Sequence, residues 1–128
     1  MHEEDMAILK SLVVVAWVDG RVADEEKEHI EALINAFGAN EAEAAEVREF
    51  AKTPRTLADI PITELSADDR QTLLNHAVVL TYIDGVQSDE EKQIITDLRA
   101  ALRIPDTLAS HIVSAAEARV KRLLQLNA

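Results

Sequence analysis

Two acidic segments carry the strongest chemical signal in this sequence. Residues 19–27 and 84–92 share the pattern Asp-Gly-x-x-x-Asp-Glu-Glu-Lys, which places several carboxylates close together in the chain. Carboxylate oxygens are the ligands that calcium, magnesium and manganese prefer. The EF-hand calcium loop does not fit, because with Gly20 at its position 6 the ligand positions 1 and 3 would be Val15 and Trp17. The spacing is still compatible with a cation site of another kind.

The same carboxylates also suit the start of a helix. Acidic side chains in a first turn stabilise the helix dipole, and Asp-Gly is a common helix end. This structural role is favoured for the middle pair of carboxylates in each segment, which are Asp24, Glu25, Asp89 and Glu90. A cap does not require both segments to keep the same seven-residue separation. A cation site and a structural role are therefore equally open for the Asp of each Asp-Gly pair and the acidic residue seven positions later: Asp19, Glu26, Asp84 and Glu91.

Histidine-based metal chemistry has weaker support. Glu26 and His29 have the i, i+3 spacing of di-iron carboxylate bundles, but Ile94 occupies the matching place in the second segment. An iron or zinc site is therefore disfavoured. The remaining histidines are scattered, and we expect them at the surface or beside helix ends: His2, His76 and His111. No nucleophile motif, phosphate loop or Cys-His pair is present, so we expect a protein that is not an enzyme.

The acidic segments belong to a longer internal repeat. Residues 14–38 align with residues 79–103 at a constant offset of 65, and ten of the 25 aligned pairs are identical. We interpret this as a duplication within a single domain, residues 1–128, with unit one at about 5–51 and unit two at about 66–126. The linker, residues 52–65, contains two prolines and is expected to hold one short helical turn.

Helical periodicity predicts an all-α fold in which each unit contributes three helices. The first helix of each unit is apolar on nearly every face, which predicts a central position, and Gly20 and Gly85 are expected to end these helices. The second helices should begin near Asp24 and Ser88, and a long final helix should follow Pro105. The units share one core, which gives a compact bundle of six or seven helices.

Several side chains have expected structural roles in this bundle. Capping boxes are predicted for Ser88 with Glu91 and for Asn40 with Glu43, while Ser66 with Asp69 marks another helix start. The apolar face of the final helix is predicted to consist of Leu108, Ile112, Ala115 and Leu123. Trp17 and Tyr82 occupy equivalent positions and are expected to pack beneath the Asp-Gly turns. Lys27 is expected to pair with Glu31, four residues later.

Charge and composition limit the possible partners. The formal net charge of −11 repels nucleic acids and anionic lipids, and the absence of cysteine excludes thiolate metal sites. The N-terminal sequence lacks the features of a secretory signal, and the apolar runs are far shorter than the roughly 20 residues that span a bilayer. We therefore expect a cytoplasmic protein without membrane insertion. We also expect a protein partner, although the sequence gives neither its identity nor the oligomeric state.

The repeated segments resemble the tellurite-resistance TerB family, which includes the N-terminal domain of DjlA-type co-chaperones. The resemblance covers nearly the whole chain and depends on an apolar helix ending in AWVDG or TYIDG, an acidic residue seven positions after the Asp, and a further apolar helix. It implies an all-helical fold, a role in stress responses and binding of a divalent cation through Asp19, Glu26, Asp84 and Glu91. We expect both Asp-Gly turns to meet at one end of the bundle and to share a single ion between their carboxylates. The co-chaperone member implies an alternative, a metal-free adaptor that binds other proteins through a groove between its helices.

Overall fold

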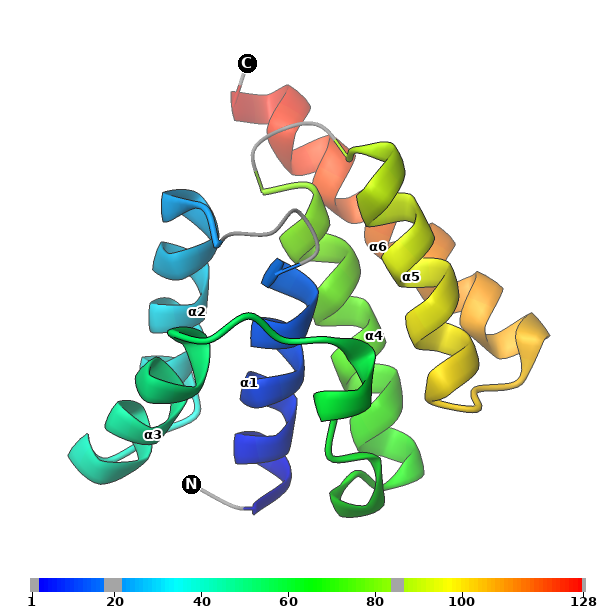
Figure 1. Ribbon diagram of the computed structural model, residues 1–128. Coiled ribbons are helices and arrows are strands. Elements are labelled where there is room, and N and C mark those ends of the chain that lie inside the picture. Colours follow the sequence, from blue (N-terminus) through cyan, green and yellow to red (C-terminus); the bar gives the residue numbers. More distant parts are fainter. Residues whose placement is uncertain (1–2, 18–21, 84–86, 128) are drawn as a thin grey trace.

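The regular secondary structure of the described residues consists of helices alone. The computed structural model describes residues 3–17, 22–83 and 87–127, with the side chains of 124–127 left aside. These residues form six α-helices: α1 (Glu3–Ala16), α2 (Asp24–Ala36), α3 (Glu41–Ala51), α4 (Ala67–Thr81), α5 (Asp89–Ala101) and α6 (Asp106–Asn127). Figure 1 shows them packed as one bundle, which confirms the predicted all-α fold.

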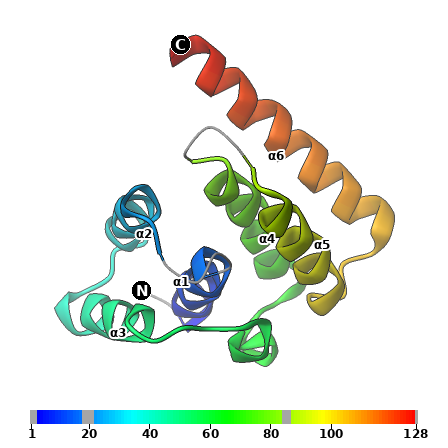
Figure 2. The same ribbon diagram turned by 45° about the horizontal axis from the view of Figure 1, so that its top comes forward.

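Helices α1 and α4 form the centre of the bundle. They lie side by side and run in the same direction, with α2 and α3 on one flank and α5 and α6 on the other (Figures 1 and 2). The consecutive residues Leu12, Val13 and Val14 point to different sides of α1, and all three are buried. A helix that is apolar all round must be enclosed by its neighbours. The predicted central position of both helices is therefore confirmed.

The second and third helices of the two units begin at positions related by the sequence offset of 65. Helices α2 and α5 have the same length, and α3 begins at Glu41 where α6 begins at Asp106. The ends differ, since α3 stops at Ala51 whereas α6 continues to Asn127. The structure therefore shows that the helix starts of the two units correspond. That the units arose by duplication is an interpretation of the sequence.

Reciprocal capping bonds fix the helix starts. The hydroxyl of Ser88 accepts from the amide of Glu91, whose carboxylate accepts from the Ser88 amide at 2.9 Å. Asn40 and Glu43 make the same exchange at the start of α3. These two predicted capping boxes are confirmed, and Ser66 with Asp69 forms a third at the start of α4. Gly20 and Gly85, expected to end the central helices, lie outside the described residues.

The linker and the final helix differ from their predictions in detail. Residues 52–65 contain two short 3₁₀ turns, η2 (Leu57–Asp59) and η3 (Ile62–Glu64), rather than one. The predicted apolar face of α6 is wrong for three of its four residues, because Leu108 is 37% exposed, Leu123 is 53% exposed and Ala115 is also exposed. The fourth, Ile112, is partly buried and packs against the core as predicted. Its buried residues are instead Ala109, Ala116 and Val120. Small side chains on this stripe let α6 approach α4 closely, which periodicity alone does not reveal.

Candidate functional site

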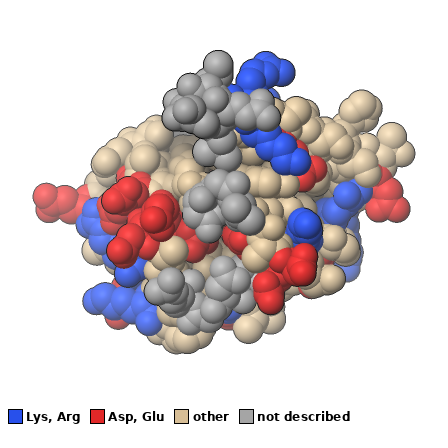
Figure 3. Space-filling view, turned by 90° about the horizontal axis from the view of Figure 1, so that it is seen from above, with Lys and Arg blue, Asp and Glu red and all other residues tan. Residues whose placement is uncertain are grey.

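Both acidic segments contribute to the same end of the bundle. The described part of α1 ends here at Ala16 and α4 ends here at Thr81, while α2 and α5 both begin here (Figure 1). Asp19 and Asp84 lie outside the described residues. Seen from above, acidic side chains gather on more than one side of this end (Figure 3).

Glu26 and Glu91 occupy equivalent positions in the first turns of α2 and α5. Glu26 Oε1 accepts a hydrogen bond from the Ala23 amide at 3.0 Å, and Glu91 Oε1 accepts one from the Ser88 amide at 2.9 Å. Both side chains are buried, with exposures of 8% and 6%. Carboxylates are rarely this buried in proteins. The bond to the amide orients each carboxylate at the helix N-terminus, where the dipole favours a negative charge.

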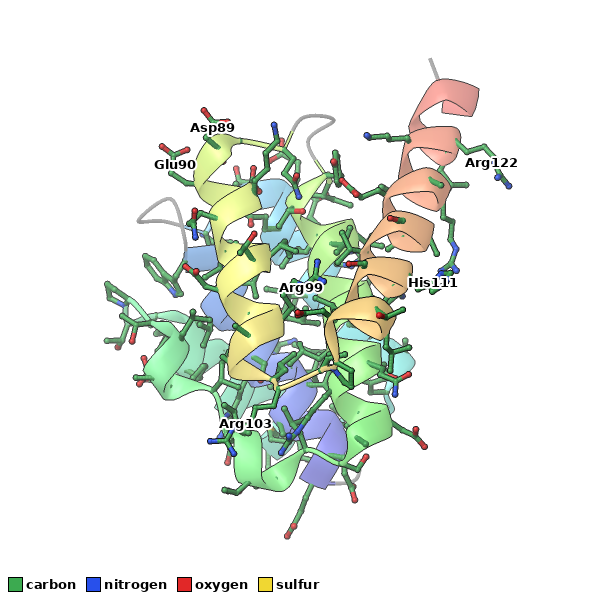
Figure 4. The ribbon with its side chains drawn as sticks, turned by 90° about the vertical axis from the view of Figure 1, so that its right-hand side faces the viewer. Asp89, Glu90, Arg99, Arg103, His111 and Arg122 are labelled. Carbon is green, nitrogen blue, oxygen red and sulfur yellow. The ribbon has the colours of Figure 1, made fainter. Side chains whose placement is uncertain are left out.

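The two buried carboxylates are not neighbours. Helices α2 and α5 lie on opposite flanks of the α1–α4 pair in Figures 1 and 2, so Glu26 and Glu91 belong to separate regions of one end. The other acidic residues of these helix starts, such as Asp89 and Glu90, point outward into solvent (Figure 4). Among the described residues, no group of three or more His, Asp or Glu side chains could hold a metal ion. A cation site at either turn would need Asp19 or Asp84 as well.

An apolar groove opens beside the start of α2. It has a volume of about 410 Å³ and lies between α2, the end of α3 and the residue that follows α1. Its floor consists of Trp17, Val22, Ile30, Ile34, Val47 and Ala51, and its rim consists of Lys27, Glu31, Arg48 and Lys52. The Trp17 indole Nε1 donates to the Ala51 carbonyl oxygen at 3.1 Å, which ties α1 to the end of α3. The expectation that Trp17 has a packing role is consistent with this contact.

The rim of this groove corrects one predicted ion pair. Glu31 pairs with Arg48 of α3 in a bidentate arrangement, Nε to Oε1 at 2.7 Å and the second nitrogen to Oε2 at 2.8 Å, and not with Lys27 as predicted. These bonds hold the pKa of Glu31 below its usual value. Glu31 pairs with Arg48 rather than with Lys27 because the planar guanidinium group of arginine can donate to both carboxylate oxygens at once, which the ammonium group of lysine cannot do.

The equivalent position in unit two is covered by α6. The Tyr82 hydroxyl donates to Glu117 Oε2 at 2.6 Å, and Lys121 Nζ lies 5.5 Å from the centroid of the Tyr82 ring. Burial, followed by the hydrogen bond to Glu117 and the negative charge of that residue, raises the pKa of Tyr82 to about 12. Nearer the start of α6, Arg99 of α5 reaches the Asp106 carbonyl oxygen at 3.0 Å and Ser110 Oγ at 2.8 Å (Figure 4).

Two histidines, His29 and His76, are partly buried, which their sequence context did not predict. His76 of α4 was expected near the surface, but it is half-buried and its ring packs edge-on against Phe37 at 6.2 Å. Burial, and then the neighbouring His29, lower the pKa of His76. Burial also lowers the pKa of His29, whose Nε2 atom has no hydrogen-bond partner among the described residues. His111 is exposed, as predicted, and His2 lies outside the described residues.

These features define a small all-helical domain with two acidic helix starts at one end and an apolar groove beside one of them. The sequence matches the family described as tellurite resistance protein TerB over residues 4–112, and the chain belongs to this family. No curated protein and no solved structure matches the chain. Within the described residues, no helix is both long enough and apolar enough to cross a membrane.

Proposed function

We propose that this TerB-family domain binds divalent cations through its two Asp-Gly-x5-Glu turns and acts, without catalysis, in a stress response in the cytoplasm. The observation that carries the proposal is the equivalence of Glu26 and Glu91. Each is a buried carboxylate, held in the same way by an amide three residues earlier, and each follows an Asp by seven residues. The candidate ligands are therefore Asp19 and Glu26 in unit one, and Asp84 and Glu91 in unit two.

The sequence favours a single cation shared by both turns, but the separation of α2 and α5 favours one cation at each turn instead. A single ion bound by both turns would require Glu26 and Glu91 to approach each other across the α1–α4 pair, whereas Asp and Glu within one turn are close in the chain. All four proposed ligands are carboxylates, which suit calcium, magnesium or manganese better than zinc. A bound cation would offset the desolvation of the buried carboxylate and would link each Asp-Gly turn to the helix after it.

Thermal unfolding in the presence of cations tests this proposal. A cation that binds only the folded chain stabilises it by about 2.7 kcal/mol at one hundred times its Kd, which corresponds to a rise of roughly 10 °C in Tm for a domain of this size. We expect such a rise with calcium, magnesium or manganese, reversed by chelation, and saturable binding in calorimetry. If none of these cations changes the Tm or gives heat on titration, the cation-binding function is wrong.

Substitutions separate cation binding from helix capping. Asp19→Ala with Asp84→Ala should abolish the cation-dependent rise, and Glu26→Gln with Glu91→Gln should weaken it while keeping an oxygen that can accept from the cap amide. Glu43→Gln is the matched control, because Glu43 caps α3 with the same bond at 2.9 Å but follows no Asp-Gly turn. If Glu43→Gln reduces the cation-dependent rise in Tm as much as Glu26→Gln with Glu91→Gln does, then Glu26 and Glu91 act only as helix caps.

The alternative proposal is a metal-free adaptor that binds another protein, for which the apolar groove gives structural support. Affinity capture of a partner with and without chelator distinguishes the two functions, because an adaptor of this kind should retain its partner after the cation is removed. For the stress-response role, growth on tellurite should be restored to a deletion strain by the wild-type gene. The Asp19→Ala, Asp84→Ala variant should fail to restore it if cation binding is required.

A further inference from the structure

The two units of the fold differ in what covers the aromatic residue after the central helix. In unit two, α6 continues past Ala116, the residue that matches the end of α3, by about three turns. The first of these turns packs on α4, where Glu117 accepts from Tyr82 and Val120 is buried. In unit one, α3 ends at Ala51 and the chain leaves the helix.

By analogy with α6, a continuation of α3 past Ala51 would run along the apolar groove. Its lining includes Ala51 and Lys52 at the end of α3, together with Trp17, which matches Tyr82. Within the described residues, Trp17 is therefore without the helical cover that Glu117 and Lys121 give to Tyr82. The indole N–H is already bonded to the Ala51 carbonyl, so the ring offers the groove an apolar surface with its polar atom satisfied.

The charge of the rim favours a partner with acidic side chains. Although the whole chain has a net charge of −11, three of the four rim residues are basic. Glu31 neutralises Arg48, and Lys52 lies 3.0 Å from Glu49 at the exposed surface. Lys27 is exposed, and no ion pair holds it within the described part of the chain. An occupant with acidic side chains beside an apolar stripe would match both the floor and the rim.

We propose that this groove binds a short acidic amphipathic helix of a partner protein. The bound helix would occupy in unit one the position that the second half of α6 occupies in unit two. The occupant presents apolar residues at i, i+4 and i+7 to Trp17 and Ile30, and acidic residues to Lys27 and Lys52. The α6 helix of a second copy does not fit, because Arg119, Lys121 and Arg122 give its second half the same sign of charge as the rim. The proposal is independent of cation binding.

Two matched peptides test it. Both are derived from residues 116–127, and each carries a covalent staple on its polar face that holds it as a helix, so that binding does not include the free energy of helix formation. One is unmodified, and the other contains Arg119→Glu, Lys121→Glu and Arg122→Glu, so the two have the same apolar residues and opposite charge. Trp17 is the single tryptophan of the chain, so its fluorescence reports on the groove directly. Titrations are done with and without chelator.

We expect the acidic peptide to shift the Trp17 emission saturably, and to bind at least about ten-fold more tightly than the unmodified peptide. Lys27→Glu with Lys52→Glu should remove that preference, whereas Lys92→Glu, at the position matching Lys27 in unit two, should keep it. Ala51→Leu should block binding by filling the groove. Circular dichroism melting confirms that each variant is folded.

Other results would overturn the proposal. These are equal affinity for the two peptides, no shift of the emission with either peptide at millimolar concentration, or an equal loss of affinity in Lys92→Glu. An equal response to octanoate would assign the groove to small amphiphilic anions. A dimer in sedimentation equilibrium that Ala51→Leu dissociates would assign the groove to a second copy of the chain.

Discussion

The hydrogen bond between Tyr82 and Glu117 gives the sharpest test of how α6 is held on the bundle. Tyr82→Phe removes only the hydroxyl, so the ring, which belongs to a residue that is 7% exposed, keeps its packing. The lost bond is short, 2.6 Å, and its acceptor is a carboxylate. Hydrogen bonds to charged groups contribute about 1.5–3 kcal/mol. Glu117 is only half-buried, so water can replace the lost hydroxyl as its hydrogen-bond donor. We therefore expect Tyr82→Phe to lower the free energy of unfolding by about 1–2 kcal/mol and the Tm by roughly 5 °C.

The pH dependence of this contribution follows from the raised pKa of Tyr82. The hydroxyl has a pKa of about 12 in the folded chain and 10.0 as its ordinary value. Between these values the folded state binds more protons than the unfolded state, so stability falls as pH rises. The contribution is therefore complete below pH 10, decreases from there to about pH 12, and is lost above it. Tyr82→Phe should show a smaller decrease than the wild type in this range.

A direct titration can check this prediction, because Tyr82 is the single tyrosine of the chain. The ultraviolet absorbance of the phenolate should give a midpoint near 12 for the folded protein and near 10 in urea. Glu117→Gln should lower the folded midpoint only part of the way, since burial is the largest cause of the shift and remains in the variant. A folded midpoint near 10, or a Glu117→Gln midpoint identical to that of the wild type, would refute the reasoning.

Three further predictions concern stability. Ala23 stands where unit two has the capping Ser88, and Ala23→Ser should stabilise the chain by about 0.5–1 kcal/mol in urea unfolding, whereas Ser88→Ala should cost about as much. Burial lowers the pKa values of His29 and His76, so stability should fall as pH drops below about 6.5, and His29→Leu should reduce this fall in pH-dependent melting. Arg70 donates to three backbone carbonyls, of Ile62, Leu65 and Leu102, and Arg70→Ala should cost about 2–3 kcal/mol.

Local interactions explain why much of the fold could be predicted from the sequence. The capping boxes Ser88–Glu91 and Asn40–Glu43 join residues three positions apart, so their geometry is set by the helix itself. The central position of α1 and α4 follows from their apolar residues on every face. The candidate site was predictable only in part. The helix position of Glu26 was readable from the repeat, but its burial depends on neighbours distant in the chain.

The sequence by itself determined the helices, their starts, the family and the net charge, because each depends on residue type and on spacing along the chain. Only the tertiary structure decided that Glu31 pairs with Arg48 from another helix and that His76 is half-buried against Phe37. It also decided which stripe of α6 is buried, and that α3 ends where a groove opens beside Trp17. The physical reason is that these contacts depend on how closely helices approach one another. That approach is set by side chains on both partners, which the periodicity of one helix does not contain.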